Sequence, residues 1–232
     1  MAKIKYSALV SDMRNKLNGS VLSKNRYGSY VRNKVTPVNP QTSYQQAVRQ
    51  RLGSLSAAWR NLSQPQRLAW TETSKSAPFT DIFGDTKVLD GKAFFVKLNS
   101  NLLSIGEDVL TNAPALQDFP SIAITGAAVE TDGTVSISMS EPTLPAGFAL
   151  KVYATPALPA QINFVKNRMR ELAAPVTLAA GNATLTAAYA SRFAAPGDAD
   201  ELKRVFFRAV LVSTISGQQG VPTEFVATVT AV

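Results

Sequence analysis

Carboxylates are the chain's main candidates for acid–base or metal chemistry, because it contains no histidine and no cysteine. That composition excludes Ser-His-Asp triads, imidazole catalysis, thiolate zinc sites and cysteine nucleophiles. Asp81, Asp85 and Asp90 share one loop, 76–90, where paired carboxylates could hydrolyse glycosides or bind calcium. The spacing lacks the central glycine and final glutamate of a calcium loop. We therefore interpret this group as a solvated loop.

A second acidic group, at Asp198, Asp200 and Glu201, stands beside Gly197 and is typical of a turn with a helix cap or a weak cation site. A solvated loop is the simpler interpretation here too. The chain has no dinucleotide fingerprint, phosphate-binding loop, nucleophile elbow or Ser-x-x-Lys set. We predict a protein that is not an enzyme, with no cofactor and no metal site.

The positive charge is concentrated in one part of the chain. Residues 1–76 hold 13 Lys and Arg against 2 acidic residues, a net charge of +11, whereas residues 77–232 hold 11 against 14, a net charge of −3. A cationic segment indicates contact with a polyanion or an acidic protein surface. Neither a signal peptide nor an 18-residue apolar span is evident, so we expect no membrane segment and a protein assembled in a cytoplasm.

Residues 1–40 are interpreted as a basic extended arm that contains a β-hairpin. The strands are expected at 21–23 and 29–35, with Gly28 in the turn, and alternation places Tyr30, Arg32 and Lys34 on one face. We expect the arm to dock on a neighbouring subunit by adding a strand to a sheet edge, in preference to binding DNA phosphates. The predicted docking residues are Lys24, Arg26, Tyr27, Tyr30, Arg32, Lys34, Arg49 and Arg51.

Residues 41–106 are predicted to form a three-helix unit. The first helix carries an apolar stripe spaced by three or four residues: Tyr44, Val48, Leu52, Leu55, Trp59 and Leu62. Ser63, with Pro65 and Gln66, begins a second helix, and a third spans 91–105, with Asp90 as its cap and Gly106 at its end. The predicted core is Trp59, Leu62, Trp70 and Phe95. A stacking platform for nucleic acid is the alternative role for the two tryptophans.

Residues 107–120, with two prolines, are expected to be a linker, and residues 121–232 to form an antiparallel β-sandwich of the immunoglobulin or fibronectin III type. Some seven short strands separated by turn signals, one of them expected at 183–187, favour that arrangement. Residues 160–169 are either a short helix or an irregular crossing. The predicted fold class is α+β: arm, three-helix unit, linker and sandwich.

Residues 205–213, 216–223 and 225–230 resemble the last two strands of a fibronectin type III domain, a likeness that indicates fold and not function. The segments 25–32 (NRYGSYVR), 37–42 (PVNPQT), 46–49 (QAVR), 59–70 (WRNLSQPQRLAW) and 93–99 (AFFVKLN) resemble a module of small proteins from tailed bacteriophages. This second resemblance covers residues 19–106 and implies a virion structural or head-associated protein.

We therefore predict a non-enzymatic virion component that decorates or stabilises the capsid or neck. Its expected partners are the major capsid or neck and portal proteins and copies of itself. Residues 59–63 also resemble, more weakly, a high-mobility-group box, so the second hypothesis is a DNA-binding architectural protein. A glycosidase using Asp81 or Asp85 and a host-surface adhesin are the remaining alternatives.

Overall fold

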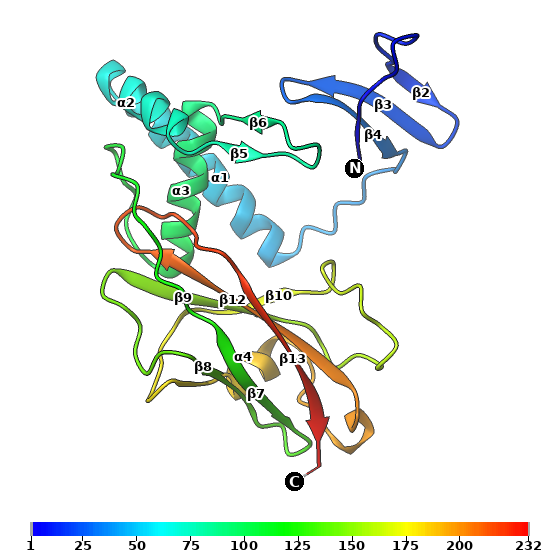
Figure 1. Cartoon of the computed structure of the whole chain (residues 1–232), viewed down its shortest axis with the longest axis vertical. Helices are drawn as coiled ribbons and strands as arrows, with labels where there is room; N and C mark the ends of the chain where they lie inside the picture. The colour runs from blue at the N-terminus through cyan, green and yellow to red at the C-terminus, as the bar shows by residue number, and fades with distance from the viewer. Residues whose placement is uncertain (1, 232) are drawn as a thin grey trace.

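The chain forms three parts that follow one another along the sequence, as a computed structural model of residues 2–231 describes them (Figure 1). A small N-terminal sheet comes first, a helical unit second and a large β region third. Figure 1 shows the helical unit above the β region, with the N-terminal sheet beside it. The α+β class predicted from the sequence is confirmed.

The N-terminal sheet consists of four short antiparallel strands, β1 (Ala2–Ile4), β2 (Asn15–Leu17), β3 (Ser20–Asn25) and β4 (Gly28–Asn33), in the order β1-β4-β3-β2. Strands β3 and β4 are the predicted hairpin, and Gly28 has a φ of 117°, a conformation that glycine adopts without a steric penalty. The expectation of only two strands is wrong. Strands β1 and β2 pair with the open edges of the hairpin, which would be marginal in water alone.

Two helices form a hairpin after the small sheet: α1 (Ser43–Asn61) and α2 (Gln64–Lys75). The Thr42 hydroxyl accepts a hydrogen bond from the Gln45 amide at the start of α1. The predicted capping box begins α2, since the Gln66 amide donates to the Ser63 hydroxyl and the Ser63 amide donates to the Gln66 carboxamide. These local bonds satisfy amides that an uncapped helix leaves without partners.

The third helix, α3 (Gly91–Ile105), has the predicted bounds and ends at Gly106, whose φ is 86°. Its N-cap residue is Asp90, but the Asp90 side chain makes no capping hydrogen bond. The segment before it contains a two-stranded hairpin, β5 (Phe79–Thr80) and β6 (Thr86–Lys87), where a loop was expected. Both departures bear on the docking surface described below.

The core of the helical unit forms around Phe95 of α3. The rings of Trp59 and Trp70 have their centroids 5.4 and 5.1 Å from that of Phe95, so each tryptophan packs on the third helix. Trp70 is fully buried, and its indole N–H donates to the Thr111 carbonyl at 2.9 Å, whereas Trp59 is only partly buried. Leu62 is buried in the same cluster. All four predicted core residues therefore belong to one cluster.

Residues 107–120 carry neither helix nor strand and lie packed against the helical unit. The buried Asn99 carboxamide accepts from the Leu110 amide at 2.6 Å and donates to the Leu110 carbonyl at 3.3 Å. Further along, the Gln117 amide donates to the Gln218 side chain at 2.8 Å. This segment is thus fastened at both ends.

The β region contains seven strands and two short helices: β7 (Ile124–Glu130), β8 (Val135–Met139), β9 (Phe148–Ala154), β10 (Arg170–Val176), β11 (Asn182–Thr184), α4 (Thr186–Arg192), the 3-10 helix Asp198–Asp200, β12 (Arg204–Ser213) and β13 (Thr223–Thr230). The strand order is β10-β9-β12-β13-β7-β8-β11, a nearly closed sheet. Neighbours are antiparallel except β13 and β7, which pair in parallel. The strand expected at 183–187 is wrong beyond Thr184, because α4 begins two residues later.

One hydrophobic core fills the β region, with fully buried side chains such as Val129, Ile137, Val152 and Phe207 from both halves of the strand order. Helix α3 packs on this region, where Leu102 and Ile105 contact Ala149 and Val212. The helical unit therefore sits directly on the β region, as Figure 1 shows.

The junction between α3 and the β region leaves no room for a side chain at Gly217 and buries the charge of Lys151. At Gly217, with a φ of 72°, a β-carbon would run into the Leu98 carbonyl oxygen. Nearby, the buried Lys151 ammonium lies 3.0 Å from the Glu171 carboxylate and donates to the Ser104 hydroxyl at 2.8 Å. The paired and hydrogen-bonded charge is consistent with a fixed interface, since an unpaired buried charge would be costly.

Candidate docking surface

One face of the N-terminal sheet is basic and carries an aromatic ring. Residues directly opposite one another on neighbouring strands share a face, so the pairs Lys16–Val21, Val21–Arg32 and Lys3–Tyr30 lie on the same side. Tyr30 and Arg32 are therefore grouped as predicted. Lys24 points to the other face. Its neighbour in β3, Ser23, is opposite Tyr30, and successive residues of a strand point to opposite faces.

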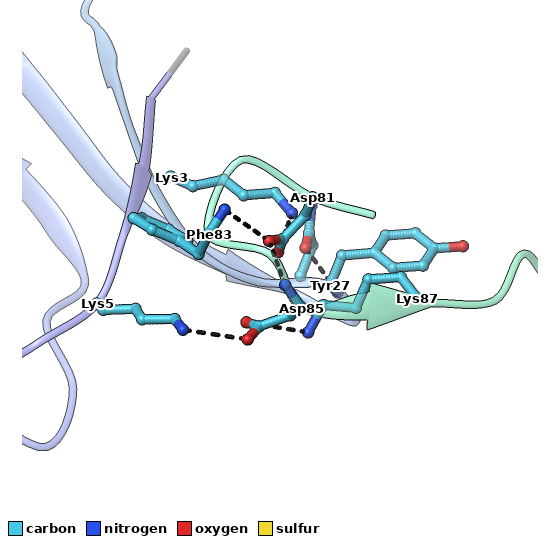
Figure 2. Close-up of polar contacts among 8 residues, drawn as sticks. Lys3, Lys5, Tyr27, Asp81, Phe83, Asp85 and Lys87 are labelled. Atoms are coloured by element: carbon cyan, nitrogen blue, oxygen red, sulfur yellow. Dashed lines mark hydrogen bonds and ion pairs between the residues drawn. The ribbon is translucent and has the colours of Figure 1, made fainter. Parts of the chain in front are cut away.

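The small sheet is fastened to the rest of the chain by three ion pairs. Lys3 Nζ lies 2.7 Å from Asp81 Oδ2, and Lys5 Nζ lies 3.1 Å from Asp85 Oδ1 (Figure 2). Arg26 Nη1 lies 3.6 Å from Asp90 Oδ1. Figure 2 shows Lys3 and Lys5 reaching the turn between β5 and β6, with Phe83 beside them. All three acceptors are the carboxylates that the sequence pattern singled out.

Asp81 is the most firmly held of these carboxylates. Its side chain is only 3% exposed, and it accepts backbone hydrogen bonds from Phe83 at 2.9 Å and Asp85 at 3.2 Å, besides the bond from Lys3. The hydrogen bond from the Lys3 ammonium, reinforced by the two backbone amides, lowers the pKa of Asp81 from 3.8 to about 2, although burial acts in the opposite direction.

The interpretation as a solvated loop is therefore wrong for Asp81, whereas the side chains of Asp85 and Asp90 remain 40% and 53% exposed although each has a cationic partner. Each carboxylate receives a cation from the N-terminal sheet, at a sequence separation too large for a local pattern to reveal. Asp90 faces Arg26, and its side chain makes no hydrogen bond to the first turn of α3. The loop acts as the anchor of the basic sheet.

The second acidic group is likewise engaged locally. Asp200 lies 2.7 Å from Lys203 and accepts a hydrogen bond from the Gly197 amide at 3.3 Å, and the bond from Lys203 lowers its pKa. Within residues 2–231, no cluster of three or more metal-ligating side chains occurs. In the same range, no helix has both the length and the apolar character required to cross a bilayer.

Several of the predicted docking cations have no carboxylate within ion-pair distance in the described part of the chain, and these are Lys24, Arg32, Lys34, Arg49 and Arg51. Arg49 donates to the Asn39 side chain at 2.8 Å, and Arg51 is half-buried on α1. Tyr27 packs edge-on against Phe79 of β5, with 6.1 Å between the ring centroids. Tyr27 thus helps to hold the small sheet on the helical unit.

A shallow groove of about 520 Å³ lies where the β3–β4 turn, α1 and α3 meet. Its lining combines cationic, anionic, apolar and polar side chains: Arg26, Tyr27, Leu52, Ser56, Asp90, Lys92, Ala93 and Val96. The sequence places Leu52 on the apolar stripe of the first helix, and this side chain is 54% exposed. The groove and the anchors Lys3 and Lys5 were not predicted. No local sequence pattern pairs Lys3 and Lys5 with Asp81 and Asp85, because the partners are 78 and 80 residues apart.

Comparisons with protein-family models, with curated proteins and with solved structures found no match to this chain. The functional argument therefore depends on the chain's own residues.

Proposed function

We propose that this chain is a non-enzymatic structural component of a tailed-bacteriophage virion, which attaches through residues 1–106 to the capsid or neck. The observation that carries the proposal is a set of cations on or next to the N-terminal sheet and on α1 that have no carboxylate partner within residues 2–231: Lys24, Arg32, Lys34, Arg49 and Arg51. An acidic neighbouring surface complements them. The resemblance of residues 19–106 to a phage module supports the virion as the setting.

The β region supplies the building material in this proposal, as a sandwich of the fibronectin III type. In support, the strand order divides into β7-β8-β11 and β10-β9-β12-β13, the two sets enclose one core, and only a short parallel pairing joins them. A β-bulge and Pro175 interrupt β10 at one edge, which hinders further strand addition there.

Virion attachment can be tested with particles produced after deletion of the chain's gene. Purified chain added back should sediment with the particles, and a variant that combines Arg32→Glu with Lys34→Glu should rebind at least about tenfold more weakly. A Lys166→Glu variant in the β region is the control and should rebind like the wild type. Mass spectrometry of wild-type particles that does not detect the chain would contradict the proposal.

DNA binding is the second candidate, favoured by the face that combines Lys16 and Arg32 with Tyr30. Phosphates would release counterions from the basic residues, so binding should weaken steeply as salt rises. A gel shift of the full chain at two salt concentrations is the direct measurement. Absence of a shift at low salt would eliminate this candidate.

A further inference from the structure

The apolar stripe of α1 is buried over its second half and exposed over its first. Leu55 is 1% exposed and Leu62 is 7% exposed, in the core of the helical unit. On the same face, Tyr44, Val48 and Leu52 are 54%, 46% and 54% exposed. Their spacing of four residues places them in one line along the helix. Two turns of α1 therefore present an apolar surface that the rest of residues 2–231 leaves about half exposed.

This exposed line runs into the groove described above. Leu52 belongs to both, and beyond it Ala93 and Val96 of α3 extend the apolar floor toward Tyr27. In Figure 1 the first half of α1 lies between the N-terminal sheet and the β region, with α2 and α3 at its other end. The combined surface is long enough to receive an extended or helical segment.

The rim of this surface is mostly cationic, and the carboxylate in the groove lining, Asp90, is paired with Arg26 at 3.6 Å. At about 100° per residue, Arg49 and Arg51 lie on opposite sides of the apolar line. The guanidinium of Arg192 lies 4.9 Å from the centre of the Tyr44 ring, and Lys92 lines the groove. None of these four cations has a carboxylate within 4.0 Å among residues 2–231.

Charge decides between the candidate occupants. Helix α1 has three arginines and no acidic residue, so the same face of a second copy would bring only like charges together. Nucleic acid would neutralise the arginines but would leave the apolar line uncovered. A segment with apolar side chains on one side and carboxylates on the other satisfies both features.

We propose that the groove and the exposed half of α1 dock an acidic amphipathic segment of a partner protein, with its apolar side chains against Val48, Leu52 and Val96. Its carboxylates face Arg49, Arg51 and Lys92. The proposal rests on the proposed function, because it specifies the chemistry of the partner that the N-terminal third contacts.

The probe is a synthetic amphipathic peptide with leucines on one helical face and glutamates on the other, labelled for fluorescence anisotropy and titrated with the full chain. The same peptide with lysines in place of glutamates should not bind. Leu52→Glu should weaken binding about tenfold, because it removes a side chain that the complex buries. Arg51→Glu should weaken it about threefold.

Leu68→Glu is the matched control, since Leu68 of α2 is also 54% exposed but lies outside the groove. Val48→Glu should repeat the Leu52→Glu result, and thermal unfolding should show that all variants are folded. Equal binding of both peptides, no binding, or equal losses in Leu68→Glu and Leu52→Glu would overturn the proposal. A dimer that Leu52→Glu dissociates would overturn it in favour of a second copy.

A nucleic-acid occupant is separated with a short DNA duplex. Binding that Arg51→Glu abolishes and Leu52→Glu leaves intact would replace the peptide with DNA. Two outcomes separate an error in the groove proposal from an error in the proposed function. Particles that rebind Leu52→Glu like the wild type refute the groove alone, whereas a chain missing from particles but binding the peptide refutes the virion assignment alone.

Discussion

The two β parts of this molecule are held in place by different forces. In the β region, a single core of fully buried side chains such as Val129 and Phe207 joins all seven strands. Among the described residues of the N-terminal sheet, Leu22 is the one buried apolar side chain. Ion pairs link this sheet to the helical unit. The contrast indicates that the first is a permanent framework and the second an attachment that charge can loosen.

The largest expected effect lies in the β region. Phe207 is fully buried in β12, so Phe207→Ala should lower the free energy of unfolding by about 3–5 kcal/mol, through lost burial and the cavity it leaves. Phe164→Ala is the control, because Phe164 is 82% exposed, and it should change stability by less than about 0.5 kcal/mol. Urea unfolding followed by circular dichroism measures both. Equal effects would mean that the region lacks the hydrophobic core described here.

The junction between the helical unit and the β region is the next test. Gly217→Ala should destabilise the chain by about 2 kcal/mol or more, because alanine resists a φ of 72° and its β-carbon meets the Leu98 carbonyl. Gly53→Ala in α1 has open space around it and should stabilise by up to about 1 kcal/mol. Thermal unfolding distinguishes the two signs. A neutral Gly217→Ala would show that α3 does not rest on the β12–β13 turn.

The elements that sequence could predict are those with long, regular signals. The apolar stripe and the caps at Thr42 and Ser63 located α1 and α2, and Gly106 marked the end of α3. The three-residue strands β1 and β2 were missed, because three residues give too little alternation to identify a strand. Helix α4 was partly assigned to a strand, since its seven residues, TAAYASR, do not complete a recognisable stripe.

The candidate docking surface shows which contacts a sequence pattern cannot predict. The cations on the small sheet were predicted, but their division was not: Lys3, Lys5 and Arg26 anchor the sheet, while Arg32 stays available. Lys3 and Lys5 are about 80 residues from their partners in the sequence, and Arg26 and Asp90 lie on separate elements. Only the tertiary fold brings these pairs together. The exposure of the first half of the α1 stripe was not predicted either, because periodicity reports an apolar face and not what covers it.

A pH titration should release the N-terminal sheet and leave the β region folded. The pKa of Asp81 is lowered from 3.8 to about 2, so its contribution is fully present above about pH 4 and is lost as the pH falls toward 2. The protection factors of the β1 amides, which correct the hydrogen-exchange rate for its intrinsic fall toward low pH, should therefore drop several-fold across that window, whereas those of β12 should stay unchanged. Asp81→Asn should give fast β1 exchange already at neutral pH. Unchanged β1 protection factors at low pH would show that other contacts hold the sheet.

The smallest expected effect separates the ion pairs from one another. Lys5 and Asp85 are 57% and 40% exposed at their side chains, so water and salt screen this pair far more than Lys3 and Asp81. Lys5→Ala should speed β1 exchange by no more than about threefold at physiological salt, and less at high salt, whereas Lys3→Ala should match Asp81→Asn. If Lys5→Ala instead releases β1 as fully as Lys3→Ala, the three pairs act as one network, and the attachment depends on the turn between β5 and β6 as a unit.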